Sequence, residues 1–283
     1  MGIMTKTKPK LGQNFLNDGQ AVERIAGALG DLTGRTVIEV GPGRGAITHA
    51  LAVRAAHVVA VELDPVMAER LRAEFPADRV SVVNQDVLQF DFAGASKAAG
   101  ERLAVFGNLP YGITSPILTR LAAQSPALDC AVLMVQREVA DRVAAAPGSR
   151  DYGVLSISVQ LHGPVEKLLT LSPTAFSPPP EVYSTVFRWR FKPRFAELGV
   201  EETGFLRFVR QCFAQKRKTL ANNLRAAGMA APEVSAALEE AEIEGQARAE
   251  SLSIERLARL WRILELRGAT STGEIAPESE TRS

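Results

Sequence analysis

The tetrapeptide Asn108-Leu109-Pro110-Tyr111 combines residue types that suit chemistry on the amino group of a nucleobase. It follows the apolar run 103–106, in the position of a loop at the end of a buried strand. The Asn108 side-chain oxygen and the backbone carbonyl of Leu109 or Pro110 can accept hydrogen bonds from an exocyclic amine, while the Tyr111 ring stacks on the base. Because Pro and Tyr are also ordinary loop residues, the tetrapeptide needs support from elsewhere in the chain.

A glycine-rich turn upstream supplies part of that support. The apolar run 36–40 leads into the pattern G-x-G-x-x-A, formed by Gly41, Gly43 and Ala46. Glu62 lies about twenty residues further on, where an acidic residue binds the ribose hydroxyls of an adenosine cofactor. A nicotinamide-dependent dehydrogenase and a methyltransferase share this pattern, because both bind an adenosine ribose at the carboxyl ends of parallel strands.

Three features of the sequence favour the methyltransferase. Glu39 precedes the glycines on the same strand, Asp86 follows the third expected strand, and Asn108 ends the fourth. Two of the acidic residues have simpler interpretations when taken alone, since Glu62 can cap the helix that follows it and Asp86 can be a turn residue. Together they place polar groups at the tips of four adjacent strands, where open sheets bind ligands.

The hydrophobic patterns predict an α/β fold followed by a helical region. Apolar runs alternate with helical patterns up to about residue 190, which indicates a mostly parallel sheet, and the last two strands are expected to form an antiparallel pair at one edge. We therefore predict a first domain at 1–191, a helical domain at 192–267 and a disordered tail at 268–283. Strands are expected over residues 37–40, 58–62, 80–84, 103–107, 128–136, 165–171 and 182–190, and helices over 47–53, 66–75, 116–123, 152–161, 203–214, 215–227, 232–240 and 254–266.

Composition excludes several classes of protein. The chain has 283 residues, of which 46% are hydrophobic, yet no apolar stretch is long enough to span a membrane and no secretory signal precedes the first domain. A cytoplasmic location is therefore expected. Two cysteines are too few for a disulfide framework, and the three histidines are not spaced as ligands, so no metal site is expected.

The order and spacing of several segments resemble those of the ribosomal RNA adenine N6,N6-dimethyltransferase family. The resemblance is to its small-subunit branch, the enzymes whose loss gives kasugamycin resistance. The resemblance implies a class I, Rossmann-like methyltransferase sheet with a small helical domain. The matching segments are 11–16 (LGQNFL), 39–43 (EVGPG), 62–64 (ELD), 85–86 (QD), 108–111 (NLPY), 176–180 (FSPPP) and 215–220 (QKRKTL).

The resemblance also implies a cofactor, a target and the residues that bind them. The cofactor is S-adenosylmethionine, and the target is a pair of adjacent adenosines in the hairpin near the 3′ end of small-subunit RNA. The implied cofactor-binding residues are Gln13, Asn14, Leu16, Gly41, Gly43, Glu62, Asp86 and Asn108. The implied catalytic residues are Asn108, Leu109, Pro110 and Tyr111, together with Phe176, which would cover the opposite face of the base.

Basic residues are concentrated in two places although the net charge is only +1. Such runs are usually solvated surfaces, but beside a base-modifying site they are expected to bind the RNA backbone. The first group is Lys6, Lys8 and Lys10, and the second is Arg207, Arg210, Lys216, Arg217, Lys218 and Arg225. The expected partner is the RNA of the small ribosomal subunit, and a monomer is expected.

Three alternative functions are compatible with these patterns. One is dimethylation of large-subunit RNA, against which the segments 176–180 and 215–218 argue. Another is a DNA adenine methyltransferase, which usually has Pro where this chain has Leu109. The third is a ribosome-assembly factor for which methylation is secondary, and under that hypothesis an Asn108→Ala protein still binds immature subunits.

Overall fold

A computed structural model describes residues 14–268, which form two compact units. The first contains residues 14–144 and 158–193, and the second contains residues 145–157 and 194–268. The division after Pro193 lies two residues beyond the domain boundary expected from the sequence. Residues 145–157, which the sequence prediction assigns to the first domain, group with the second unit.

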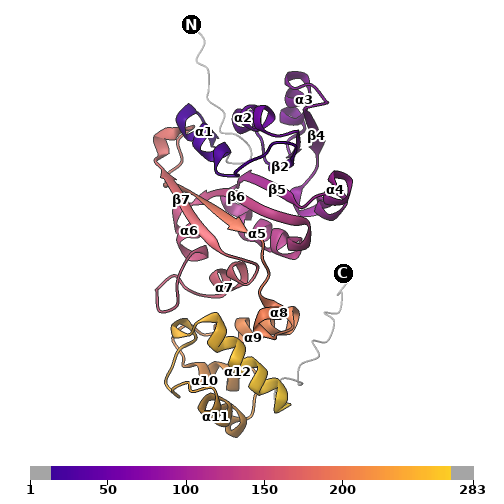
Figure 1. The fold of residues 1–283 in the computed structure, drawn as a ribbon. Coiled ribbons are helices and arrows are strands. Elements are labelled where there is room, and N and C mark those ends of the chain that lie inside the picture. The colour runs from indigo at the N-terminus through magenta and orange to yellow at the C-terminus, as the bar shows by residue number, and fades with distance from the viewer. Residues whose placement is uncertain (1–13, 269–283) are drawn as a thin grey trace, which may run out of the picture. The chain divides into compact units, whose positions relative to one another are not determined.

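The first unit is built on one seven-stranded sheet with the order β4-β3-β2-β5-β6-β9-β7 (Figure 1). Five neighbouring strands, from β4 to β6, are parallel, whereas β9 runs antiparallel to both β6 and β7. The predicted α/β fold and the antiparallel edge pair are thus confirmed. The strands are β2 (Thr36–Val40), β3 (His57–Glu62), β4 (Val80–Asn84), β5 (Leu103–Asn108), β6 (Leu128–Gln136), β7 (Val165–Leu171) and β9 (Ser184–Arg190).

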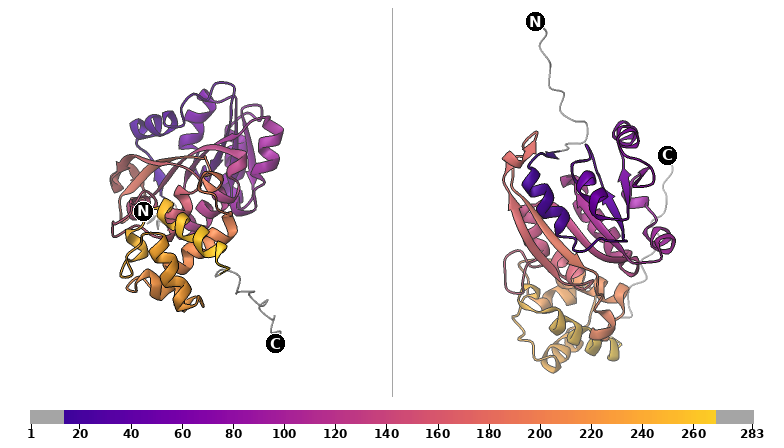
Figure 2. Two further views of the ribbon diagram at one scale, coloured as in Figure 1. Left: turned by 60° about the horizontal axis from the view of Figure 1, so that its bottom comes forward. Right: turned by 45° about the horizontal axis from the view of Figure 1, so that its top comes forward.

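Helices cover both faces of this sheet, as the views in Figures 1 and 2 show. On one face α1, α2 and α3 contribute Ile25, Leu51 and Leu71 to a core that includes Val37 and Phe106 of the strands. Because side chains alternate along a strand, the intervening buried residues face the other layer. The helices of the unit are α1 (Gly19–Gly27), α2 (Ala46–Arg54), α3 (Pro65–Glu74), α4 (Phe92–Ala99), α5 (Thr114–Ala123) and α6 (Arg137–Val143), and α7 (Val154–Gln160) crosses the division between the units.

A separate two-stranded sheet joins segments that are far apart in the sequence. β1 (Phe15–Leu16) pairs antiparallel with β8 (Phe176–Ser177), with Leu16 opposite Phe176. Asn17 N also donates to Ala175 O at 2.9 Å. The side chains of Leu16 and Phe176 are buried in the core, so the N-terminal segment is held by both backbone pairing and packing.

The second unit is helical and packs around α12, whose buried face includes Leu257, Trp261 and Leu264. Residues 145–157 belong here because their backbone bonds into it: Gly148 N donates to Glu250 O at 2.7 Å. The helix expected over 215–227 is wrong in its first part, since residues 213–219 form turns. The helices are α8 (Phe195–Leu198), α9 (Glu202–Cys212), α10 (Leu220–Ala226), α11 (Ala231–Glu240) and α12 (Ile254–Leu266).

Candidate functional site

The glycine turn between β2 and α2 lines a pocket at the carboxyl ends of the parallel strands. Gly41, Gly43 and Gly45 have φ angles of 65°, 57° and 82°, in the left-handed region that other residues adopt only with strain. A Cβ atom on Gly43 would lie 2.9 Å from Cε1 of Phe15. Glycine is therefore needed both to turn the chain and to let the Phe15 ring lie against the backbone.

Glu62, at the end of β3, holds this turn in place. Its Oε2 accepts from Gly43 N at 3.0 Å and its Oε1 accepts from Asp64 N at 2.9 Å, and the side chain is only 1% exposed. Asp86 follows β4 and accepts from Leu88 N at 2.9 Å, which makes it a turn residue in this structure. Neither carboxylate lines the pocket: Glu62 ends β3, which pairs with β2, and Asp86 follows β4, the next strand outward.

Glu39 is a buried carboxylate in the wall of the pocket. It is not among the cofactor-binding residues that the family resemblance implied. It is 1% exposed, and its Oε2 has no hydrogen-bond partner within the described residues. Burial, with a further contribution from the negative charge of Glu62, raises the pKa of Glu39 to about 8. The hydroxyl of Thr48 acts in the opposite direction, but its oxygen does not reach hydrogen-bond geometry. An acceptor of this kind suits a cationic ligand group.

The N-terminal segment lies against the predicted catalytic asparagine. Asn14, Phe15 and Leu16 all line the pocket. Asn108 Nδ2 donates to the backbone carbonyl of Asn14 at 3.1 Å, which leaves Asn108 Oδ1 available as an acceptor. The guanidinium of Arg44, in the glycine turn, lies 4.3 Å from the centre of the Phe15 ring. One short segment thus contacts both the glycine turn and Asn108.

The loop after Asn108 presents its two carbonyl groups differently. Leu109 is buried, and its N–H donates to Met134 O of β6 at 3.0 Å. The Pro110 carbonyl accepts from Ile113 N at 3.2 Å and from the Thr114 hydroxyl at 3.1 Å, so both of its lone pairs are used. In the part of the chain that the structure describes, the Leu109 carbonyl has no such donor. Of the two carbonyls considered from the sequence, that of Leu109 is the one open to a ligand.

Pocket-lining residues include eight of those proposed from the sequence. Phe176 lines it with a side chain that is 4% exposed, and the backbone of Tyr111 begins a short 3₁₀ turn. The eight are Asn14, Leu16, Gly41, Gly43, Asn108, Leu109, Pro110 and Phe176. Glu62 and Asp86 lie outside the lining. Gln13, Lys6, Lys8, Lys10 and the tail beyond residue 268 lie outside the described residues, as does the side chain of Tyr111.

Sequence reasoning missed several lining residues because their signals are tertiary. Met134 and Ser184 come from β6 and β9, far from any motif, and reach the pocket only because these strands are neighbours. Phe15 lies between Asn14 and Leu16, which were both identified, so adjacency alone was a usable signal. Glu39 was recognised in the sequence as part of the glycine motif but was given no role.

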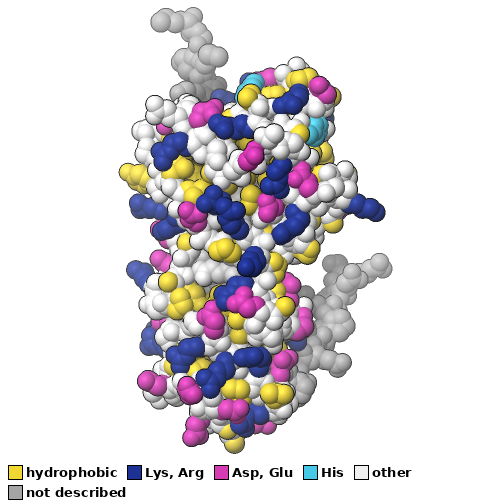
Figure 3. Space-filling model, in the orientation of Figure 1, with side chains coloured by type: hydrophobic (Ala, Val, Ile, Leu, Met, Phe, Trp, Pro, Cys, Tyr) yellow, Lys and Arg dark blue, Asp and Glu magenta, His cyan; other side chains and the backbone are white. Residues whose placement is uncertain are grey.

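In the second unit, the predicted basic residues surround the turn between α9 and α10. All six are exposed, and none forms an ion pair with a residue in the range 14–268. Elsewhere on the face of each unit drawn in Figure 3, basic and acidic side chains are interspersed. The six are Arg207 and Arg210 on α9, Lys216, Arg217 and Lys218 in the turn, and Arg225 on α10.

A buried asparagine shapes this basic turn. Asn223 of α10 is 2% exposed; its Oδ1 accepts from Gln215 N at 3.0 Å and its Nδ2 donates to Cys212 O at 2.8 Å. These bonds satisfy backbone groups that a continuous helix would have paired internally. Asn223 therefore stabilises the turn over residues 213–219, which presents three cations.

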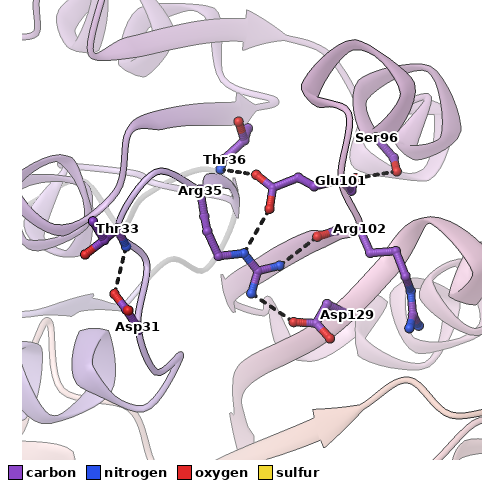
Figure 4. Close-up of polar contacts among 8 residues, drawn as sticks. All are labelled: Asp31, Thr33, Arg35, Thr36, Ser96, Glu101, Arg102 and Asp129. Atoms are coloured by element: carbon purple, nitrogen blue, oxygen red, sulfur yellow. Dashed lines mark hydrogen bonds and ion pairs between the residues drawn. The ribbon is translucent and has the colours of Figure 1, made fainter.

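The opposite edge of the sheet has polar residues of a different kind (Figure 4). Arg35, just before β2, bonds Glu101 Oε2 and Asp129 Oδ2 at 2.9 Å each and the Arg102 carbonyl at 2.7 Å. The second oxygen of Glu101 accepts from Thr36 N at 2.7 Å. Although burial alone would lower it, the hydrogen bonds to Asp129 and Glu101 raise the pKa of Arg35. This network joins the amino ends of β2, β5 and β6.

The described residues contain neither a membrane-spanning helix nor a cluster of metal ligands. No helix between residues 14 and 268 is long and apolar enough to cross a membrane. The same range contains no group of three or more His, Cys, Asp or Glu side chains arranged to hold a metal ion.

Comparison with known protein families and sequences gives consistent matches over almost the whole chain. Residues 4–266 match the model of a family described as ribosomal RNA adenine dimethylase. A ribosomal RNA small subunit methyltransferase A from Acidobacterium capsulatum is 56% identical over 264 residues, which cover 93% of each chain. A protein of the same name from Koribacter versatilis is 45% identical over 266 residues, covering 90% of this chain and 93% of the other.

Solved structures resemble the fold of this chain along most of its length. The 23S rRNA methyltransferase ErmE is 28% identical with a TM-score of 0.68, and the match covers 89% of this chain and 100% of that one. A dimethyladenosine transferase from Plasmodium falciparum has a TM-score of 0.76 at 24% identity, covering 90% of this chain and 98% of the other. These likenesses confirm the predicted methyltransferase fold.

Proposed function

The chain belongs to the ribosomal RNA adenine dimethylase family, and from this premise we propose that it is an S-adenosylmethionine-dependent enzyme that dimethylates adenosine N6 in small-subunit ribosomal RNA. The proposed target is the pair of adjacent adenosines in the 3′-terminal hairpin, and the product is N6,N6-dimethyladenosine. The observation that carries the proposal is the meeting of Asn108 with the glycine turn and residues 14–16 around one pocket.

The residues around the pocket fit the proposed cofactor. Bound S-adenosylmethionine supplies an electrophilic methyl group on a sulfonium centre, and its methionine end carries an ammonium group. Glu39 offers a buried oxygen without a partner, which suits that ammonium, and the glycine turn lets a ligand approach the backbone. Glu62 is proposed to bind the ribose hydroxyls and Asp86 the adenine amino group, with residues 13–16 covering the site.

Asn108 and Leu109 are proposed to prepare the target amine. The lone pair of adenine N6 is delocalised into the ring, so it must be turned out of the ring plane before it can attack. Hydrogen bonds from N6 to Asn108 Oδ1 and to the Leu109 carbonyl favour that geometry, and positioning of this kind lowers a barrier by several kcal/mol as an order of magnitude. The bond from Asn108 Nδ2 to Asn14 O keeps the oxygen end of the amide free for this task.

Neither a general base nor a metal ion is required by this chemistry. The positive charge moves from sulfur to nitrogen, and the resulting ammonium is acidic enough to lose its proton to water. Tyr111 and Phe176 are proposed to hold the base between them. Each stacking contact contributes about 1–3 kcal/mol in comparable single-strand sites, and the target adenosine must first leave its own stack.

The second domain is proposed to bind the RNA backbone. We assign residues 1–191 to methyl transfer and residues 192–267 to RNA binding through the six exposed cations. Binding through phosphate contacts should weaken steeply as salt rises. The name shared by the relatives at 56% and 45% identity favours small-subunit over large-subunit RNA, whereas the likeness to the 23S enzyme is weaker in sequence, at 28%.

Transfer of labelled methyl groups tests the proposal directly. The protein would be given S-adenosylmethionine with undermethylated small subunits, large subunits or naked DNA, and Asn108→Ala would serve as the control. We expect dimethyladenosine only in the small subunit and none with the variant, which should still bind subunits. Binding by the unsubstituted protein without transfer would instead favour the assembly-factor function, and transfer to large subunits would favour the large-subunit branch.

A further inference from the structure

Arg137 and Tyr183, which no sequence motif identified, lie next to residues that line the pocket. Strand β6 ends at Gln136 opposite Ser184, the first residue of β9. Ser184 lines the pocket, as does Met134 two residues before the end of β6. Arg137 N then donates to Tyr183 O at 2.9 Å, which fixes these two residues side by side at the carboxyl edge of the sheet.

The Tyr183 side chain is unusually accessible. It is 46% exposed, and its neighbour Val182 is 41% exposed. Every other Phe, Tyr or Trp side chain that the structure describes is buried or half-buried. An aromatic ring left exposed at the edge of a pocket is available for stacking against a ligand.

Arg137 places a positive charge beside this ring. Its guanidinium carbon lies 5.1 Å from the centre of the Tyr183 ring, and the side chain is exposed. Other arginines of the first unit, such as Arg35, Arg54 and Arg188, bond to carboxylates. Arg137 has no carboxylate partner among residues 14–268, so its charge is not neutralised locally.

An aromatic ring beside an unneutralised guanidinium matches the chemistry of a nucleotide. A nucleobase stacks on an aromatic face regardless of its sequence, and a planar guanidinium binds phosphate through paired N–H groups. A peptide partner of opposite charge would use Arg137 but would gain little from the open ring. RNA must also be unstacked around the target adenosine, which leaves neighbouring bases in need of new stacking partners.

We propose that Tyr183 and Arg137 form a subsite for a nucleotide that flanks the target adenosine, in which the ring stacks on the base and the guanidinium binds a phosphate. This inference rests on the proposed function, because it assumes that an adenosine in RNA enters the adjacent pocket. It adds a contact in the first unit, separate from the basic turn of the second. The subsite holds the strand during transfer and takes no part in the chemical step.

The test combines kinetics with equilibrium binding to undermethylated small subunits. We expect Tyr183→Leu to raise the KM for subunits about tenfold and to weaken binding equally, without change in kcat or in the KM for S-adenosylmethionine. Tyr183→Phe, which keeps the ring, should behave like the unsubstituted protein. Arg137→Ala should reduce the slope of log affinity against log salt concentration by about one. Val53→Ala, an exposed apolar residue on α2, and Lys97→Ala, an exposed cation on α4, are the matched controls.

The outcomes separate this subsite from the proposed function. Unchanged binding and KM in both Tyr183→Leu and Arg137→Ala would overturn the subsite, as would a fall in kcat alone. Equal losses in Tyr183→Phe and Tyr183→Leu would also overturn it, because stacking would then not be the cause. If the unsubstituted protein binds subunits but transfers no methyl group, the proposed function fails, and the binding measurements still decide whether the subsite exists.

Discussion

The two edges of the parallel sheet use polar residues in opposite ways. At the amino edge, Arg35, Glu101 and Asp129 bond to one another and to backbone groups (Figure 4). At the carboxyl edge, Glu39 Oε2 and Thr48 Oγ1 are buried without partners among residues 14–268, and the glycine turn has left-handed backbone. The amino edge satisfies its polar groups internally, whereas the carboxyl edge leaves acceptors for something else to satisfy.

This difference separates stability from function within one sheet. Buried polar groups without partners cost free energy. Such polar groups are tolerated at a site where a bound ligand supplies their missing hydrogen bonds. Substitutions at the amino edge should therefore change the free energy of unfolding and spare methyl transfer, and substitutions at the carboxyl edge should mostly do the reverse.

The largest effect is expected from Asn108→Asp. The carboxylate keeps an acceptor for the target amine but cannot donate to Asn14 O, which lies 3.1 Å from Asn108 Nδ2. Repulsion between the two oxygens should turn the side chain away from Asn14 and misplace the acceptor, while the pairing of β1 with β8 keeps Phe15 and Leu16 in position. We expect the rate of methyl transfer to fall by about a hundredfold, with little change in thermal unfolding. A variant that keeps half of its activity would show that the donated bond is dispensable.

Arg35→Ala tests the amino edge. It removes two ion pairs and the bond to the Arg102 carbonyl, in a side chain that is 26% exposed. We expect the free energy of unfolding to fall by about 2 kcal/mol, as measured by urea denaturation, because Glu101 and Asp129 lose their partner. S-adenosylmethionine affinity should be unchanged. A loss of affinity as large as the loss of stability would contradict the separation of the two edges.

The pH dependence of stability tests Glu39. Its pKa is raised from 4.5 to about 8 in the folded protein, so the folded state binds a proton that the unfolded state has lost. The resulting stabilisation is complete below about pH 4.5 and is lost as the pH rises toward 8. Unfolding of the ligand-free protein should become easier by about 1–2 kcal/mol between pH 6 and pH 8.

Glu39→Gln should abolish that decline, because glutamine does not titrate. Thermal unfolding at pH 6 and pH 8 checks both proteins. In the unsubstituted protein, S-adenosylmethionine should bind more tightly at pH 8 than at pH 6, since its ammonium favours the ionised carboxylate. An identical pH profile in the variant would mean that another group is responsible.

The smallest effect is expected from a pair of glycine substitutions. Gly43→Ala and Gly30→Ala both force a non-glycine residue into the left-handed region, at φ angles of 57° and 87°. Each should cost about 1 kcal/mol of stability. A Cβ at Gly30 has open space, whereas one at Gly43 meets Phe15 at 2.9 Å. Only Gly43→Ala should weaken S-adenosylmethionine binding in a calorimetric titration, and equal weakening by both would show that strain alone is the cause.

Much of the fold was predictable because its strands are strongly apolar. All seven strands of the main sheet lie within two residues of their predicted bounds, and Leu128–Gln136 and Val165–Leu171 match them. The helices α1, α4, α6 and α8 were not predicted; none is longer than nine residues. Strands β1 and β8 have two residues each, too few to show a period, and they exist only because they pair with each other.

The candidate site was predictable where its residues come from motifs. Gly41, Gly43 and Asn108 were identified from their spacing and line the pocket. The start of α10 was misplaced, because the side chain of Asn223 bonds to the backbone of the preceding turn and no local pattern encodes that contact. Arg137 and Tyr183 could not be identified from local sequence patterns either, because they meet only through the pairing of β6 with β9.

The sequence by itself determined the order of the seven main strands along the chain, the glycine turn and the asparagine that ends β5 at the pocket. These depend on local periodicity, on backbone conformations that only glycine adopts readily, and on residue types. Only the tertiary structure decided that Glu39 Oε2 has no partner in the described part of the chain, that Asn14 orients Asn108, and that Leu109 rather than Pro110 has an open carbonyl. Each of these depends on which groups remain unpaired after folding, and that is settled by neighbours distant in the sequence.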